Sequence, residues 1–404
     1  MRNTTIQAGP ARALAPATVT VGIVGLGLAS TAHLRGYQTH PQAQVLAVCD
    51  VERARAEAFA AEHALAKVYT DFTALLADPA INTIDIATPT YLHAPMALQA
   101  AQAGKHIHCE KPFCRNVGEG MAVCAAVQAH GVKLVVGETY VFLTAHMQAR
   151  QLIEAGEIGR PLQIRQRHGA WHRRGDHNLH LAPSARNWRI DPTKSGGGAY
   201  PWIFDHAVHF FATAEYLLLD QSIAEVYAVA AKGGGVKRQG AEHDPYETAE
   251  VDIPIITWTY ADGAAQGVWM RAERLNGKYD YMQGFSTTII GETGMIEVLG
   301  EGGHNLLWNG RQQHLLLHRE GKETLTWRFD EGGDKVWASD ISYYGQGHIN
   351  QAHHLIDCII HDQQPRYGGE AGVHAVRCTL AAIRSAQEGR PVRVDEITPT
   401  YTAY

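Results

Sequence analysis

Short apolar runs alternate with longer stretches of mixed apolar and polar residues up to about residue 137. The short runs have the length of buried strands, and the longer stretches of about 10–15 residues have the pattern of helices. Strands and helices that alternate in this way build a doubly wound parallel sheet. We expect strands at residues 19–24, 45–49, 83–87, 105–109 and 132–137, and helices at 52–65, 71–76, 91–103 and 117–130.

The pattern changes beyond residue 137. A helix is expected at 145–155 and a strand at 162–171, and a loop rich in His, Arg and Gly then extends to 198. Many β-type runs lie between 223 and 329, which favours a large, mostly antiparallel sheet. Further strands are expected at 248–260, 263–271, 287–290, 295–299 and 315–317, and two closing helices at 349–361 and 372–388.

The turn between the first strand and the first helix has the sequence GLGLAS, at residues 25–30. Gly25 permits a tight turn, Gly27 lets the backbone approach a pyrophosphate, and the N-terminus of the helix supplies free N–H groups. Ser30 stands at the third glycine position and is small enough for close packing. Asp50 ends the second strand, where an acid that binds ribose belongs. The cofactor contacts expected here are Gly25, Gly27, Leu28, Ala29 and Asp50; the alternative is an ordinary tight turn.

Asp50 also favours NAD over NADP. Its carboxylate can accept hydrogen bonds from both ribose hydroxyls, whereas a 2′-phosphate at ~4 Å would be repelled by a few kcal/mol at an effective dielectric constant of ~20. Arg53 and Arg55 follow closely and could reach such a phosphate. The alternative is that both arginines are solvated on the first turn of the next helix.

The 404 residues are enough for two domains. We predict a flexible arm at 1–18, an α/β dinucleotide-binding Rossmann domain at 19–138, and an α+β domain for substrate binding and oligomerisation at 139–404. The net charge of −6 gives no reason to expect nucleic acid or a membrane surface as a partner. No apolar run reaches the ~18 residues of a membrane helix. Six cysteines without a Cys-x-x-Cys pair indicate reduced thiols and a cytoplasmic protein.

Two clusters can carry chemistry. Glu110-Lys111-Pro112 directly follows an expected parallel strand, whose carboxyl end borders the ligand crevice, so Lys111 can stabilise an alkoxide there. Taken alone, the tripeptide is more often a surface turn. Asp205 and His209 are four residues apart, on one face if the segment is helical, and His209 can take a hydroxyl proton near neutral pH. The alternative is a capping aspartate with a core histidine.

The chain as a whole resembles the Gfo/Idh/MocA oxidoreductases, a family named for glucose–fructose oxidoreductase and inositol dehydrogenase. The resemblance covers roughly residues 18–394 and depends on several motifs in this order. They are Gly25-Leu26-Gly27, Asp50, Thr88-Pro89-Thr90 with His93, Glu110-Lys111-Pro112, Trp188-Arg189, Gly196-Gly197-Gly198 with Asp205 and His209, and the C-terminal stretch 382–392.

The resemblance implies a nicotinamide enzyme that acts on sugars, polyols or their derivatives. It assigns catalysis to Lys111, Asp205 and His209, and contact with the cofactor to Thr88, Pro89, His93, Glu110, Lys111, Trp188 and Arg189. One departure is that six residues, 199–204, separate the glycine run from Asp205, so the loop there is expected to bulge. His206 is a second candidate for the base.

A histidine-rich stretch raises the question of a metal. His168, His172, Asp176, His177 and His180 include ligand-like spacings, but with 23 histidines in the chain we predict chance clustering and no functional metal. Some of these residues, with Trp171, Arg173 and Arg174, are instead expected to line a substrate pocket. The substrate-binding candidates are Lys111, Tyr140, Trp171, His172, His206, His209 and Tyr281, with His348 a further one.

These observations favour an NAD-dependent dehydrogenase of a carbohydrate secondary alcohol. His209, assisted by Asp205, removes the hydroxyl proton, and Lys111 steadies the oxyanion while hydride passes to the nicotinamide. One alternative is an enzyme that cleaves glycosides by transient oxidation with bound NAD, and another is a non-catalytic dinucleotide-binding regulator. The open face of the second sheet predicts a homodimer or homotetramer.

Overall fold

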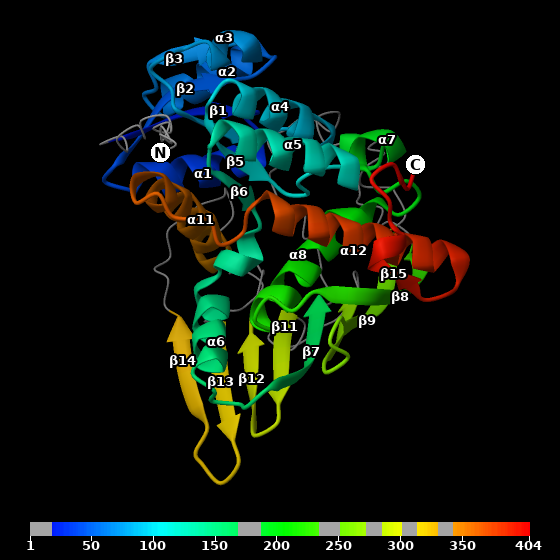
Figure 1. Ribbon diagram of the computed structural model, residues 1–404. Coiled ribbons are helices and arrows are strands. Elements are labelled where there is room, and N and C mark those ends of the chain that lie inside the picture. Colours follow the sequence, from blue (N-terminus) through cyan, green and yellow to red (C-terminus); the bar gives the residue numbers. More distant parts are fainter. Residues whose placement is uncertain (1–17, 169–186, 234–250, 272–284, 301–312, 330–341) are drawn as a thin grey trace, which may run out of the picture.

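The computed structural model describes residues 18–168, 187–233, 251–271, 285–300, 313–329 and 342–404. Figure 1 shows two sheets, the first with its helices in the upper part of the molecule and the second in the lower part. Helices α8, α11 and α12 lie between the two sheets in this view. Several residues singled out in the sequence lie outside the described residues. They are the substrate-binding candidates Trp171, His172 and Tyr281, and Asp176, His177 and His180 of the histidine-rich stretch.

The first sheet has six strands in the order β3-β2-β1-β4-β5-β6, and every pairing in it is parallel. The chain steps outward from β1 in one direction through β2 and β3, and in the other through β4, β5 and β6. The carboxyl ends of β1 and β4 therefore border the crevice at which such sheets bind ligands. The strands are β1 (Val19–Val24), β2 (Ala43–Cys49), β3 (Lys67–Tyr69), β4 (Thr83–Ile86), β5 (His106–Glu110) and β6 (Leu134–Gly137).

Local chemistry fixes the ends of several helices in this part. Asn116 caps α5 by accepting the N–H of Glu119, and Gly131 ends that helix in the left-handed conformation, at the bounds the pattern predicts. The expected helix at 52–65 is shorter because Ala64 has a φ of 54°, and β3, which follows, was not predicted. The helices are α1 (Leu28–Gln38), α2 (Arg53–Glu62), α3 (Phe72–Leu76), α4 (Thr90–Gln102) and α5 (Val117–His130).

The second sheet has nine strands in the order β14-β13-β12-β11-β7-β10-β9-β8-β15. Its pairings are antiparallel except for β10 with β7. The predicted α/β Rossmann domain followed by an α+β domain with a mostly antiparallel sheet is thus confirmed. The strands are β7 (Pro161–His168), β8 (Ile223–Gly233), β9 (Val251–Tyr260), β10 (Gln266–Arg271), β11 (Phe285–Gly291), β12 (Gly294–Leu299), β13 (Gln313–Arg319), β14 (Leu325–Phe329) and β15 (Val392–Arg393).

Helices connect the two sheets. The mostly buried α8 has 13 of its 17 residues in the interior, and α12 packs against α8, β8 and α5, while α11 packs against α1. Both closing helices begin earlier than predicted, since α11 starts at Ser342 and α12 at Gly369. No helix among the described residues is long and apolar enough to cross a membrane. The helices are α6 (Thr144–Glu154), α7 (Pro192–Ser195), α8 (Pro201–Leu217), α11 (Ser342–Ile360) and α12 (Gly369–Glu388), with short 3-10 turns η1 (Thr139–Phe142), η3 (Asn187–Arg189) and η5 (Val394–Glu396).

Candidate active site at the carboxyl edge of the first sheet

The glycine turn after β1 has the shape that a dinucleotide pyrophosphate needs. Gly25 has a φ of 86°, and a Cβ there would lie 2.7 Å from Thr88 Cγ2 and 2.8 Å from the backbone of Ala87. At Gly27, the N-cap of α1, a Cβ would meet nothing within 4 Å, so this side of the turn is open. Ser30 is fully buried and its hydroxyl donates to the Gly27 carbonyl at 2.7 Å, which suits the small third position of the motif. The turn therefore fits a pyrophosphate at the start of α1.

Asp50 lies beside this turn and is almost fully buried. Its Oδ2 accepts the N–H of Leu26 at 3.0 Å, and its Oδ1 accepts the N–H of Glu52 at 2.9 Å. Arg55 is not merely solvated, because its Nη1 lies 3.0 Å from Asp50 Oδ2 and its Nη2 lies 2.6 Å from Glu52. Arg53 is exposed, as expected in the alternative interpretation. Asp50 is thus fixed beside the glycine turn, and the Arg55 guanidinium adjoins it.

The Thr88-Pro89 turn follows β4 and leads into α4. His93, one turn into that helix, is buried, and its two ring nitrogens lie 2.7 Å from the carbonyls of Thr88 and Pro112. Burial is the largest influence on this imidazole and lowers the pKa of His93. His93 therefore lies between two backbone segments at the sheet edge, the Thr88 turn and the segment that contains Pro112.

Lys111 directly follows β5 and reaches across to α8. Its Nζ lies 3.3 Å from the carbonyl oxygen and 3.4 Å from Oδ1 of Asp205. Arg189 Nε and His206 Nδ1 lie 3.9 and 3.7 Å from Asp205 Oδ2. Burial alone would raise the pKa of Asp205, but Lys111, then His206 and Arg189, outweigh it and hold that pKa below its ordinary value. Asp205 is therefore a carboxylate that anchors the Lys111 ammonium.

His209 lies one helical turn after Asp205 on α8, as the spacing predicts. Asp205 makes no hydrogen bond to His209 among the described residues; the hydrogen-bond partner of His209 Nδ1 is Glu138, and the expected assistance from Asp205 stays a prediction. Glu138 directly follows β6 and was missed by the sequence reasoning, although an acid placed after a buried parallel strand is a usable signal. The ring of Tyr140, a predicted pocket residue, packs against that of His209 at a centroid distance of 4.9 Å.

The extra residues between the glycine run and Asp205 do not bulge, in contrast to the prediction. Helix α8 begins at Pro201 with Tyr200 as its N-cap, so residues 201–204 form its first turn, and Asp205 and His209 follow on the next turns. Gly196 and Gly198 have φ values of 93° and 55°. A Cβ at Gly198 would overlap the carbonyl oxygen of Ala403, so only glycine fits there. The glycine run is thus a tight connection into α8.

The remaining candidates border this edge or lie deeper. His206 Nδ1 is 3.0 Å from the Trp202 carbonyl and 3.2 Å from Arg271 Nη1, so its surroundings differ from those of His209. Arg189 stacks on the ring of Trp188 at 4.6 Å. His348 is buried on α11, where burial lowers its pKa to about 3 and keeps it neutral.

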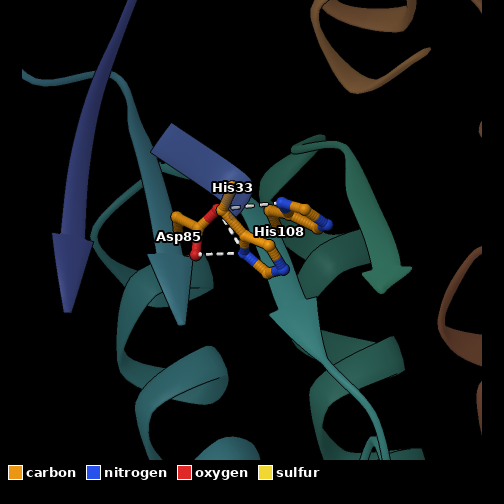
Figure 2. Close-up of side chains that lie close together, drawn as sticks. All are labelled: His33, Asp85 and His108. Atoms are coloured by element: carbon orange, nitrogen blue, oxygen red, sulfur yellow. Dashed lines mark hydrogen bonds and ion pairs between the residues drawn. The ribbon is translucent and has the colours of Figure 1, made fainter. Parts of the chain in front are cut away.

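A buried polar network underlies the site. Figure 2 shows His33 of α1 and His108 of β5 both reaching the carboxylate of Asp85 on β4, with nitrogen–oxygen distances of 2.9 Å. The Tyr37 hydroxyl donates to the same carboxylate at 2.7 Å. The Asp85 carboxylate is thus shared by two imidazoles and a phenol hydroxyl, while His108 Nε2 is buried with no hydrogen-bond partner among the described residues.

The network extends to the residue before Lys111. His33 Nε2 lies 3.1 Å from Glu110 Oε1, and Glu110 Oε2 accepts the N–H of Lys111 at 3.0 Å. Both nitrogens of His33 face carboxylates, so both carry protons. Burial alone would lower the pKa of His33, but Asp85 and Glu110 raise it to about 10, and His33 in turn helps to hold the pKa of Glu110 at about 2 against burial. A buried imidazolium thus links α1 with Lys111.

Comparison with protein families identifies the chain. Residues 19–138 match the model of an oxidoreductase family with an NAD-binding Rossmann fold, and residues 150–394 match that family's C-terminal alpha/beta domain. The chain belongs to the Gfo/Idh/MocA oxidoreductase family. Its first sheet is the NAD-binding part of that fold.

Relatives of this oxidoreductase include proteins named as dehydrogenases of polyols and sugars. The scyllo-inositol 2-dehydrogenase (NAD(+)) of Bacillus subtilis is 27% identical over 379 residues, which cover 93% of this chain and 96% of the relative. The levoglucosan dehydrogenase of Pseudarthrobacter phenanthrenivorans is 34% identical over 284 residues, or 65% of this chain and 70% of the relative. A solved levoglucosan dehydrogenase in complex with NADH and levoglucosan shares the fold, with a TM-score of 0.74, 24% identity, and coverage of 93% of this chain and 99% of that one.

Proposed function

We propose that this oxidoreductase is an NAD-dependent dehydrogenase that oxidises a secondary hydroxyl of a sugar, polyol, anhydrosugar or glycoside. The observation that carries the proposal is that the Lys111 ammonium, at the carboxyl edge of the first sheet, meets α8 at Asp205, one helical turn before the His209 imidazole. Lys111 is held by Asp205, and His209 lies on the next turn of the same helix. The names of the relatives support a carbohydrate or polyol as the substrate.

The residues that would hold NAD lie along the carboxyl edge of the first sheet. The pyrophosphate would bind at the open turn of Gly25, Gly27, Leu28 and Ala29, and the ribose at Asp50. Thr88, Pro89 and the Glu110–Lys111 segment would line the nicotinamide side, with His93 behind them and Trp188 and Arg189 across the crevice. NAD is favoured over NADP because Asp50 would repel a 2′-phosphate.

The mechanism divides two tasks between two side chains, His209 and Lys111. His209 takes the proton of the substrate hydroxyl, and Lys111 donates a hydrogen bond to the oxygen as negative charge develops on it. Asp205 keeps the Lys111 ammonium in place. Bound NAD supplies the hydride acceptor. Substrate contacts are assigned to Lys111, Tyr140, His206 and His209, and to Trp171, His172 and Tyr281 outside the described residues.

A pair of variants tests this assignment. His209→Ala should lower the rate of NADH formation by about 10²-fold or more, because the general base is lost. Its dissociation constant for NAD should change by less than about threefold, since His209 does not touch the glycine turn. His206→Ala should cost less, because His206 faces Arg271 and the Trp202 carbonyl. A rate for His209→Ala equal to that of the wild type, or a larger loss in His206→Ala, would overturn the choice of base.

Assays of NADH formation, NAD binding and glycoside cleavage separate the two alternative functions, a glycoside-cleaving enzyme and a non-catalytic regulator. A glycoside-cleaving enzyme would carry tightly bound NAD through purification and release sugar from a glycoside without net formation of NADH. A regulator would bind NAD and turn over neither class of compound. The presence of Lys111, Asp205 and His209 together favours an enzyme, because a sensor does not need all three.

We also propose that this oxidoreductase assembles as a homodimer or homotetramer through the second sheet. Helices cover one face of that sheet, whereas Tyr227, Val229, Ile255 and Met270 on β8, β9 and β10 are 38 to 48% exposed. An exposed apolar patch of this kind is typical of an interface. Light scattering on the purified protein should give a mass of two or four chains, and a monomer would contradict the proposal. A cytoplasmic location is proposed from the free cysteines.

A further inference from the structure

We propose that Glu138 is a positioning residue for the proton transfer, fixing His209 in the tautomer whose Nε2 is free to take a proton. The inference rests on the proposed function, in which His209 is the base. It goes beyond that function by assigning to Glu138 the role that spacing alone had given to Asp205.

The backbone of Glu138 is held where the first sheet ends. Its N–H donates to the Val136 carbonyl at 2.7 Å, and its own carbonyl accepts the N–H of Val141 at 3.1 Å, which starts the turn η1. The Glu138 side chain is 1% exposed and that of His209 is 5% exposed. A buried carboxylate is costly unless it is hydrogen-bonded, so the pair with His209 Nδ1 is the contact that stabilises Glu138 in place.

The hydrogen bond determines which nitrogen is available for chemistry. A carboxylate oxygen only accepts hydrogen bonds, so Nδ1 of His209 must carry the proton. In the neutral ring Nε2 then has a free lone pair, which is the acceptor that a substrate hydroxyl requires. The Tyr140 ring packs against His209 at 4.9 Å and restrains the plane of the imidazole. Glu138 and Tyr140, which both follow β6, thus fix the tautomer and the orientation of the His209 ring.

Asp205 is not placed to do the same. Its side chain faces Lys111 at 3.4 Å and lies near His206 and Arg189, and it makes no hydrogen bond to His209 in the described part of the chain. Two carboxylates therefore serve two different groups. Asp205 positions the oxyanion-stabilising lysine, and Glu138 positions the base.

Nitrogen-15 NMR of labelled imidazoles tests the tautomer without any substrate. The His209 signals are assigned by their loss in His209→Asn. In the wild-type protein the neutral His209 should show a protonated Nδ1 and an unprotonated Nε2, and Glu138→Gln should abolish this preference. A wild-type His209 protonated at Nε2, or a Glu138→Gln spectrum equal to that of the wild type, would overturn the proposal.

Steady-state kinetics test the consequence. Glu138→Gln should lower kcat by about 10²-fold, because the amide N–H₂ can donate to Nδ1 and select the wrong tautomer. KM and the dissociation constant for NAD should stay within about threefold of the wild type. A kcat loss below about threefold, or a loss that appears only in KM, would contradict the positioning role.

Glu215→Gln is the matched control. Glu215 lies on α8 as well, and its Oε1 pairs with His374 Nε2 at 2.8 Å, so this variant also removes a carboxylate from a histidine partner. It should alter stability but leave kcat and the tautomer of His209 unchanged. If the wild-type protein oxidises no carbohydrate, the proposed function fails, while the NMR result still decides whether Glu138 sets the tautomer of His209.

Discussion

Replacing His33 by leucine should strongly destabilise the protein. His33 is fully buried and bridges two carboxylates, with Nδ1 2.9 Å from Asp85 and Nε2 3.1 Å from Glu110. Leucine would leave both carboxylates buried without their shared cation. Asp85 would keep Tyr37 and His108 as hydrogen-bond donors, and Glu110 would keep the backbone N–H of Lys111.

Removing one partner of a buried ion pair typically costs about 3–5 kcal/mol, chiefly because the other charge is left unpaired. We expect a loss of this size in the free energy of unfolding of His33→Leu, measured by urea denaturation and circular dichroism. Adding Asp85→Asn to His33→Leu should restore at least about 1 kcal/mol, because one stranded charge is then removed. The control His361→Leu alters an exposed histidine and should stay within about 0.5 kcal/mol of the wild type.

The effect should depend on pH in a definite direction. The pKa of His33 rises from 6.5 to about 10 on folding, so its stabilisation is complete below pH 6.5 and is lost as the pH rises through 10. The pKa of Glu110 falls from 4.5 to about 2, so its contribution is present above pH 4.5 and is lost as the pH falls through 2. The difference in the free energy of unfolding between wild type and His33→Leu should therefore be largest between pH 4.5 and pH 6.5. A loss below about 1 kcal/mol there, or a further loss on adding Asp85→Asn, would refute the reasoning.

Three other variants test the site. Gly25→Ala should weaken NAD binding, measured by calorimetry, by about tenfold or more, because the new Cβ would lie 2.7 Å from Thr88 Cγ2. The control is Gly104→Ala, at a residue with a φ of 68° where a Cβ meets nothing within 4 Å, and it should leave the affinity for NAD unchanged. Lys111→Met should lower kcat by about 10²-fold through loss of oxyanion stabilisation, with folding judged by circular dichroism, and an unchanged kcat would exclude that role. Asp50→Asn should raise the ratio of kcat/KM for NADP to that for NAD by about tenfold or more, because it removes a repulsive charge and releases Arg55; an unchanged ratio would show that Asp50 does not set the preference.

Local sequence patterns were sufficient for much of the fold. Alternating strands and helices predicted the parallel sheet, and the position of Lys111 after β5 predicted its place at the ligand edge, because carboxyl ends of parallel strands share one edge. The i, i+4 spacing also placed Asp205 and His209 correctly on one helix.

Partners that are distant in the sequence could not be predicted in this way. Glu138 and His209 are 71 residues apart, and His33 and Asp85 are 52 apart. Each of these polar side chains lies in or next to an apolar run. The hydrophobic pattern there predicts that the segment is buried, but not which hydrogen-bond partner a polar side chain has. Their pairing depends on the packing of α8 against η1 and on the order of strands in the sheet, which no single segment encodes.

The central claim is tested most directly by following NADH absorbance while the purified protein is offered NAD or NADP with sugars, inositols, anhydrosugars and glycosides, one compound at a time. The account predicts that NADH forms with at least one of these classes, and faster from NAD than NADPH does from NADP. Protein that binds NAD but forms no NADH with any compound in the panel would contradict it.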